Sequence, residues 1–201
     1  DRSNRIFCAC LLTFLGTMTL MTASRHLGLM WVALEATTLA TAPLLYFNRN
    51  QRSLEATWKY LLIGSVGIAL ALLGSLFLAY AAFSAGLDTS LLFEDLVRDA
   101  PRLSRPWLHA AFVLLLVGYG TKMGLAPMHT WKPDAYAEAP VPTAALMGAG
   151  FINCALYGII RFDVLAEKCL GHEFPSRLLI GFGVFSILLA APFVLVQRNF
   201  R

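Results

Sequence analysis

Long uninterrupted apolar runs are the feature that most limits how this chain can fold. A run of about twenty residues forms a helix that rises about 1.5 Å per residue and so crosses a hydrocarbon layer roughly 30 Å thick. Charged residues make up 14% of the 201 residues, and hydrophobic residues make up 58%. A soluble domain carries about a quarter charged residues. The chain is therefore expected to be all-α, a polytopic bundle of transmembrane helices in contact with the lipid bilayer.

The apolar runs predict six spanning segments. They lie at about residues 6–22, 27–47, 58–83, 107–132, 141–162 and 178–196. The polar connection at residues 84–106 is predicted to be a surface loop with a short interfacial helix near residues 91–97. Residues 1–201 are interpreted as a single transmembrane domain, and the first residue, Asp1, suggests a fragment of a longer chain. Basic residues are divided equally between the two predicted sides, which leaves the orientation open.

Composition also excludes several classes of function. The net charge is +4, but the basic residues lie at the ends of apolar runs and form no stripe, so no nucleic-acid partner is expected. The four cysteines form no CxxC pair. Cys169 with His172 offers too few ligands for a metal ion. We therefore expect neither a catalytic centre nor a metal or cofactor belonging to this chain.

Two charged residues lie where a membrane helix rarely carries charge. Glu35 lies within MWVALEATTLATAPLLYF, and Lys122 lies within FVLLLVGYGTKMGLAPM. A charge at mid-depth costs about 3 kcal/mol on insertion scales, and such residues commonly mark an ion pathway. Their mutual attraction, about 4 kcal/mol at roughly 4 Å, is large enough for small movements of Glu35 to decide whether Lys122 holds its proton. The alternative is a structural ion pair that only locks two helices together.

Helix-breaking residues follow Lys122 closely. They are Gly124, Pro127, Pro133, Pro140 and Pro142. The fourth segment is therefore predicted to be broken near mid-membrane, where irregular backbone is tolerated only if it packs in protein or lines a water-filled cavity. A broken helix beside a buried lysine is typical of transporters. Four residues after the break are predicted to lie toward the membrane interface: Trp131, Asp134, Tyr136 and Glu138.

Three further polar residues each admit two interpretations. Lys59, beside Glu55 at the start of the third segment, is predicted either to reach the headgroups or to take part in transport. His129, within the break, is predicted either to relay protons or to cap a backbone carbonyl. Asn153, in the fifth segment, is predicted either to pack between helices or to hold water.

The residues around Lys122 also resemble a known family. Residues 122–140 contain Lys-Met-Gly, Pro-Met-His-Thr-Trp, Pro-Asp-Ala and Glu-Ala-Pro in this order. Together with MWVALEATTLATAPLLYF and EATWKYLLIGSVGIALALLG, this stretch resembles the antiporter-like subunits of respiratory complex I, multi-subunit cation/proton antiporters and membrane-bound hydrogenases. The similarity is closest to component F of hydrogenase-4 or formate hydrogenlyase, and it covers nearly the whole chain.

The resemblance implies a subunit of about fourteen helices with two inverted five-helix units, each containing a broken helix. This chain would cover helices four to nine. The resemblance also implies that Glu35 and Lys122 form a proton-transfer pair, that Lys59 joins the same polar axis, and that His129 matches a histidine present after the break in many members. Asn153 stands where the complex I branch carries Lys or His. Because Asn cannot change charge, this departure favours the hydrogenase-like branch and leaves Asn153 only the orienting of water.

Three functions follow as expectations. The first is a proton-translocating subunit of a redox-driven complex, of hydrogenase or NADH dehydrogenase type, in a bacterial or archaeal cytoplasmic membrane. Its partners would be other membrane subunits and a peripheral redox arm. The second is a sodium/proton antiporter subunit or a proton-driven module of inorganic-carbon uptake. The third is a non-conducting scaffold or quinone-site subunit.

Overall fold

The structure, a computed structural model, describes residues 4–196, apart from the side chains of residues 193, 194 and 196. Both ends of the predicted domain 1–201 lie outside this range. The long helices are α1 (Asn4–Ala23), α2 (Leu27–Leu45), α3 (Gln51–Phe83), α5 (Arg105–Met123), α8 (Ile152–Leu170) and α9 (Glu173–Val196). The short elements are η1 (Tyr46–Asn48), α4 (Phe93–Asp99), η2 (Ala100–Arg102), α6 (Trp131–Glu138), α7 (Val141–Leu146) and a π-helical turn, η3 (Met147–Phe151). The expected all-α fold is confirmed for the described residues, whose only extended pairing is one bridge between His26 and Leu92.

Within residues 4–196, five helical stretches are long and apolar enough to cross a membrane. They are Asn4–Ala23, Leu27–Asn48, Gln51–Phe83, Val141–Leu170 and Glu173–Pro192. The fourth predicted segment, residues 107–132, is not a single helix, because α5 ends at Met123 and α6 begins only at Trp131. Polar residues near both ends of α5, among them Arg105 and Lys122, lower its apolar content. A crossing by α5 therefore stays a prediction.

Helices α3, α8 and α9 extend well beyond the predicted apolar runs. The α9 helix begins at Glu173 rather than near residue 178. The α3 helix begins at Gln51 rather than near Trp58, because Asn50 and Ser53 form a capping box at its start. With 33 residues it is about 50 Å long, so its first turns reach past a hydrocarbon layer of about 30 Å. The α8 helix continues to Leu170, past the predicted end near residue 162. In each case the helix is longer than the apolar run within it.

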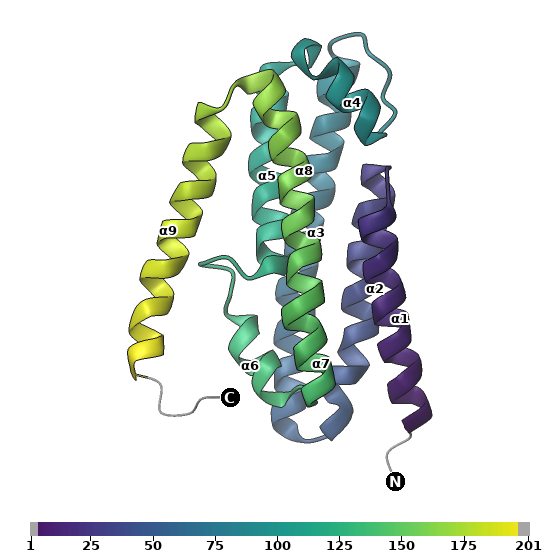
Figure 1. The fold of residues 1–201 in the computed structure, drawn as a ribbon, viewed down its shortest axis with the longest axis vertical. Coiled ribbons are helices and arrows are strands. Elements are labelled where there is room, and N and C mark those ends of the chain that lie inside the picture. Colours follow the sequence, from purple (N-terminus) through teal and green to yellow (C-terminus); the bar gives the residue numbers. More distant parts are fainter. Residues whose placement is uncertain (1–3, 197–201) are drawn as a thin grey trace.

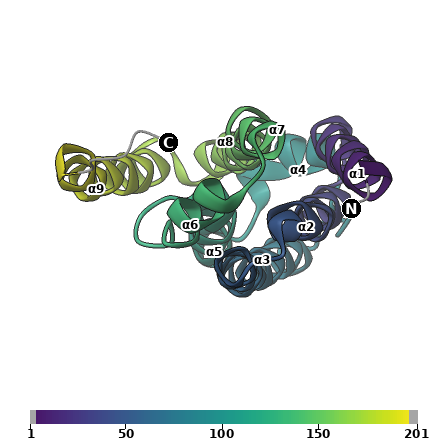
Figure 2. The same ribbon diagram turned by 90° about the horizontal axis from the view of Figure 1, so that it is seen from below.

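Helices α1, α2, α3, α5 and α8 form one bundle, and α9 lies at its outer side (Figure 1). Seen along the bundle, α9 stands apart from the other helices (Figure 2). Most of the buried apolar residues come from the facing sides of α2, α3, α5 and α8. In the stretch of α9 that could cross a membrane, 6% of the residues are buried in the protein, so this helix adds little to the core.

Glycines bring α3 and α5 unusually close. A Cβ atom at Gly67 would lie 2.6 Å from Cβ of Thr121, and one at Gly118 would lie 2.7 Å from the backbone nitrogen of Ala71. No larger residue fits at either position without moving a helix. Small residues let membrane helices approach in this way, and the contact fixes the position of α5 along α3. It therefore determines where Lys122, four residues after Gly118, is placed.

Candidate functional site

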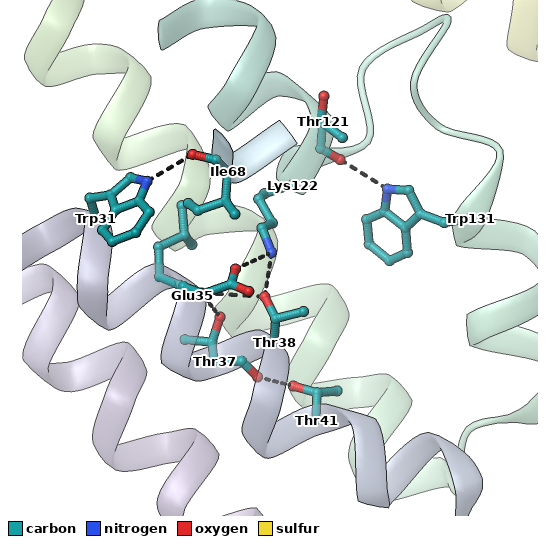
Figure 3. Close-up of polar contacts among 10 residues, drawn as sticks. Trp31, Glu35, Thr37, Thr38, Thr41, Ile68, Thr121, Lys122 and Trp131 are labelled. Atoms are coloured by element: carbon teal, nitrogen blue, oxygen red, sulfur yellow. Dashed lines mark hydrogen bonds and ion pairs between the residues drawn. The ribbon is translucent and has the colours of Figure 1, made fainter. Parts of the chain in front are cut away.

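Lys122 and Glu35 form a buried pair between α5 and α2 (Figure 3). The Lys122 side chain is 1% exposed, and its Nζ lies 3.1 Å from Oε2 of Glu35, whose side chain is 24% exposed. The same ammonium group donates a hydrogen bond to Oγ1 of Thr38. The two charged residues that the apolar runs singled out are thus brought together, although 87 residues separate them in the chain.

Helices α5, α2 and α3 each contribute something different to this pair. Lys122 lies in the last turn of α5. Glu35 and Thr38 are three residues apart on α2 and therefore share one helix face. On α3, a Cβ atom at Gly64 would lie 3.1 Å from Nζ of Lys122, so the glycine leaves the space that the ammonium group occupies.

Buried hydroxyl groups continue from Lys122 toward the turn between α2 and α3. We call them the hydroxyl stripe: Thr37, Thr38 and Thr41 of α2, and Ser53, Thr57 and Tyr60 of α3. The α3 members recur at helical spacing and share a face with Gly64. The Tyr60 hydroxyl lies beside those of Thr38 and Thr41, without meeting the geometry of a hydrogen bond.

The threonines of the stripe are partly satisfied by their own helix. Thr37 donates to the carbonyl of Leu34, and Thr41 donates to the carbonyl of Thr37 (Figure 3). A hydroxyl that donates in this way keeps its oxygen free to accept another hydrogen bond. These hydroxyl oxygens therefore keep the capacity to accept a further hydrogen bond.

The predicted break follows Lys122 directly. Gly124 has φ +82°, a left-handed conformation that glycine adopts readily, and it ends α5. Pro127 lies in the loop that follows, with its side chain exposed. The carbonyl of Gly120 accepts hydrogen bonds from the backbone nitrogens of Gly124 and Leu125, both at 2.8 Å. The broken end of α5 is thus an ordered helix terminus.

Lys59 lies at the surface of the bundle rather than beside Lys122. Its side chain is 45% exposed, and its Nζ lies 2.7 Å from Oε1 of Glu55 and 2.7 Å from Oδ2 of Asp134. The contact with Glu55 fits the interpretation that Lys59 reaches the headgroup region. The contact with Asp134, on α6, ties the segment after the break to α3.

His129 and Asn153 do not join the buried pair. The Nδ1 atom of His129 is buried, and within residues 4–196 it has no hydrogen-bond partner, so it caps no carbonyl there. Asn153 is exposed and donates to the carbonyl of Ala149 at 2.7 Å, in the preceding turn η3. No hydrogen bond or ion pair links either residue to Lys122 in the described part of the chain. A role for either in proton transfer stays a prediction.

Two residues make contacts around the pair that the sequence did not predict. Trp131 was expected near the membrane interface, but it is 1% exposed and donates to the carbonyl of Thr121 at 2.9 Å (Figure 3). Its ring packs against those of Tyr60 and Phe151. The position of Thr38, three residues after Glu35, indicated that the two side chains share a helix face. Buried threonines are common in helix packing, however, so the sequence did not reveal the contact of Thr38 with Lys122. Within the described residues, no group of three or more His, Cys, Asp or Glu side chains could hold a metal ion.

The sequence profile of the family described as NADH:quinone oxidoreductase/Mrp antiporter, TM, matches residues 24–201. The chain belongs to this family. The resemblance expected from residues 122–140 is thereby confirmed, and so is the expectation of a transmembrane protein.

Relatives of this antiporter family member occur in several membrane complexes. Over 187 residues the chain is 38% identical to a hydrogenase-4 component F homolog of Methylacidiphilum infernorum. The matched region covers 92% of this chain and 39% of that protein. Over 181 residues it is 31% identical to NADH-quinone oxidoreductase subunit N of Desulforudis audaxviator, covering 89% of this chain and 35% of that one. The chain therefore spans less than half the length of these relatives.

Two solved structures share the fold. A chain of respiratory complex I from Thermus thermophilus is 31% identical, with a TM-score of 0.79, covering 100% of this chain and 42% of that chain. A chain of an archaeal membrane-bound sulfane sulfur reductase is 24% identical, with a TM-score of 0.87, covering 96% of this chain and 38% of that chain. The second likeness concerns the fold alone.

Proposed function

We propose that this chain is the part of a membrane subunit that moves protons in a redox-driven complex, with Lys122 and Glu35 as the proton-transfer pair. The observation that carries the proposal is the 1% exposed ammonium group of Lys122, 3.1 Å from Glu35. Ionisable groups inside a membrane are expensive, and they commonly mark proton relays. The relatives named above are components of a hydrogenase and of an NADH-quinone oxidoreductase, both redox complexes.

The pair has the properties that a proton relay requires. Two unit charges about 4 Å apart attract by about 4 kcal/mol at an effective dielectric constant of about 20. A movement of Glu35 away from Lys122 changes this attraction by several kcal/mol, which is enough to change the protonation state of the amine. The adjoining hydroxyl stripe supplies oxygen atoms that can hold the water needed to carry protons to and from the amine.

The partners follow from the same reasoning. Other membrane subunits surround this one in the complex, and a peripheral redox arm drives the transport. In this proposal the redox centres lie in the partner subunits. Electron transfer in the arm moves Glu35 relative to Lys122 through the neighbouring membrane subunits.

Lys122→Ala in the full-length protein, within its intact complex, tests the proposal. We expect normal incorporation of the subunit but a lower number of protons moved per electron, measured in sealed membrane vesicles. Lys168→Ala is the matched control, because Lys168 is an exposed lysine at the end of α8. An unchanged ratio in a normally incorporated Lys122→Ala variant would refute the proposal.

Two other functions give different results in the same experiment. A scaffold subunit predicts that Lys122→Ala reduces incorporation, while each complex that does assemble keeps the parent ratio. A sodium/proton antiporter predicts that transport in proteoliposomes depends on added sodium. Transport that is the same with and without sodium supports a proton-only subunit.

A further inference from the structure

The broken end of α5 presents backbone carbonyl groups that need hydrogen-bond partners from outside the helix. The last carbonyls of any helix lack partners within the helix, and together they carry a partial negative charge. Inside a membrane, each of them needs a partner from the protein. At α5 two of these partners come from the start of α6, which begins eight residues after the end of α5.

Two consecutive side chains of α6 bind this end. Nε1 of Trp131 donates to the carbonyl of Thr121 at 2.9 Å (Figure 3), and Nζ of Lys132 donates to the carbonyl of Met123 at 3.1 Å. The two carbonyls flank Lys122. The first turn of α6 thus holds the backbone on both sides of the residue that carries the buried ammonium group.

The Lys132 side chain follows the surface of the break closely. A Cβ atom at Gly124 would lie 2.1 Å from Cδ of Lys132. The glycine therefore serves both the left-handed turn and the passage of the lysine stem. Lys132 is half-buried, so the contact is enclosed on one side by protein.

The charge of Lys132 is matched differently from the charges of Lys122 and Lys59. Lys122 has Glu35, and Lys59 has two carboxylates. Within residues 4–196, no carboxylate forms an ion pair with Lys132. Its ammonium group instead faces the negative end of α5, the position where a cation stabilises a helix.

We propose that Lys132 is a positioning residue whose ammonium group caps the broken end of α5 and thereby holds Lys122 against Glu35 and Thr38. The inference rests on the proposed function, because the positioned group is the proton-transfer lysine. A cap needs a positive charge and a hydrogen-bond donor at all times. A proton carrier needs to lose its charge. Arginine keeps its charge at any relevant pH, so it satisfies the first requirement and not the second.

The test compares Lys132→Met with Lys132→Arg in the full-length protein within its intact complex. Met keeps an unbranched stem and removes both the charge and the donor. We expect the number of protons moved per electron in Lys132→Met to fall at least about twofold, since misplacing a reacting group by about 1 Å can lower a rate about 100-fold. Lys132→Arg should keep the parent ratio. Lys168→Met, which removes an exposed lysine from the last turn of α8, is the control and should also keep it.

Each outcome decides the proposal. A parent ratio in Lys132→Met overturns it, and so does an Arg variant that is as impaired as the Met variant. If Lys132→Met is not incorporated, normal incorporation and a normal ratio in Lys132→Arg support the cap, and a reduced ratio overturns it. Lys122→Ala with an unchanged ratio would remove the proposed function itself. A reduced ratio in Lys122→Ala beside a parent ratio in Lys132→Met would remove only the cap.

Discussion

At the scale of single residues, the site depends on a charge that a membrane interior disfavours. Lys122 is enclosed by Glu35, Thr38 and the backbone at Gly64, and each of these provides something different: a countercharge, a hydrogen-bond acceptor and space. A buried ion pair gives little net stability, because desolvation offsets most of its attraction. In our proposal the pair therefore serves proton transfer rather than the stability of the fold.

Glu35→Gln tests the countercharge directly. Glutamine keeps the size of the side chain and removes the charge, so Lys122 loses several kcal/mol of attraction and its protonation is no longer controlled by residue 35. We expect the protons moved per electron to fall while the subunit is still incorporated. Glu55→Gln is the control, because Glu55 is 64% exposed and pairs with Lys59 at the surface. A Glu35→Gln variant that is fully incorporated and pumps like the parent would contradict this role.

At the scale of helices, the α2–α3 contact differs from the α3–α5 contact in chemistry. The α3 and α5 helices meet through glycines such as Gly67 and Gly118, which leave no room for water. The α2 and α3 helices meet through the hydroxyl stripe, which does bind water in our proposal. The same helix, α3, thus uses one face for tight packing and another for a polar contact next to Lys122.

Tyr60→Phe tests the polar contact. The change removes one hydroxyl beside Thr38 and Thr41 and keeps the ring packed against Trp131. We expect a slower rate of proton movement at an unchanged amount of incorporated subunit, because one oxygen of the hydroxyl stripe is lost. Tyr119→Phe is the matched control: its hydroxyl is also buried without a partner in the described residues, but its ring packs against Phe162 of α8. Equal rates in the two variants would argue against the stripe.

At the scale of the whole molecule, α9 exposes large apolar side chains to its surroundings, as α1, α2 and α3 also do. Its side chains Ile180, Ile187 and Leu188 are more than 60% exposed, although the helix is strongly apolar. One hydrogen bond ties it to the break, from the backbone nitrogen of Ala126 to Oγ of Ser186 at 3.0 Å. Such a surface needs hydrocarbon or apolar protein around it.

Ile187→Asp tests this surface. A carboxylate near the centre of a spanning helix costs about 2.5–3.5 kcal/mol on insertion scales, so we expect much less subunit in the membrane fraction. Ile187→Val, which keeps the residue apolar, should leave the amount unchanged. The measurement is the quantity of membrane-incorporated full-length subunit. Normal incorporation of the Asp variant would show that this face of α9 meets water.

The length of the apolar runs was sufficient to predict the helical membrane fold, and the Gly and Pro residues that follow Lys122 were sufficient to predict the break. The apolar runs also singled out Glu35 and Lys122, because a charge inside an apolar run is visible in the chain itself. Helix ends were predicted less well. The capping box at Asn50 and the polar continuation of α8 lie outside the apolar pattern, so the start of α3 and the end of α8 were missed.

The sequence by itself therefore determined what depends on local composition. It showed that the protein lies in a lipid bilayer, that it is helical, and which charged residues are energetically unfavourable inside the bilayer. Only the tertiary structure decided which residues meet. Contacts such as Lys122 with Thr38, Lys59 with Asp134, and Lys132 with the end of α5 join different helices. The physical reason is that such contacts depend on how closely glycines let α3 and α5 approach and on the turn at Gly124, and both are properties of packed backbone in three dimensions.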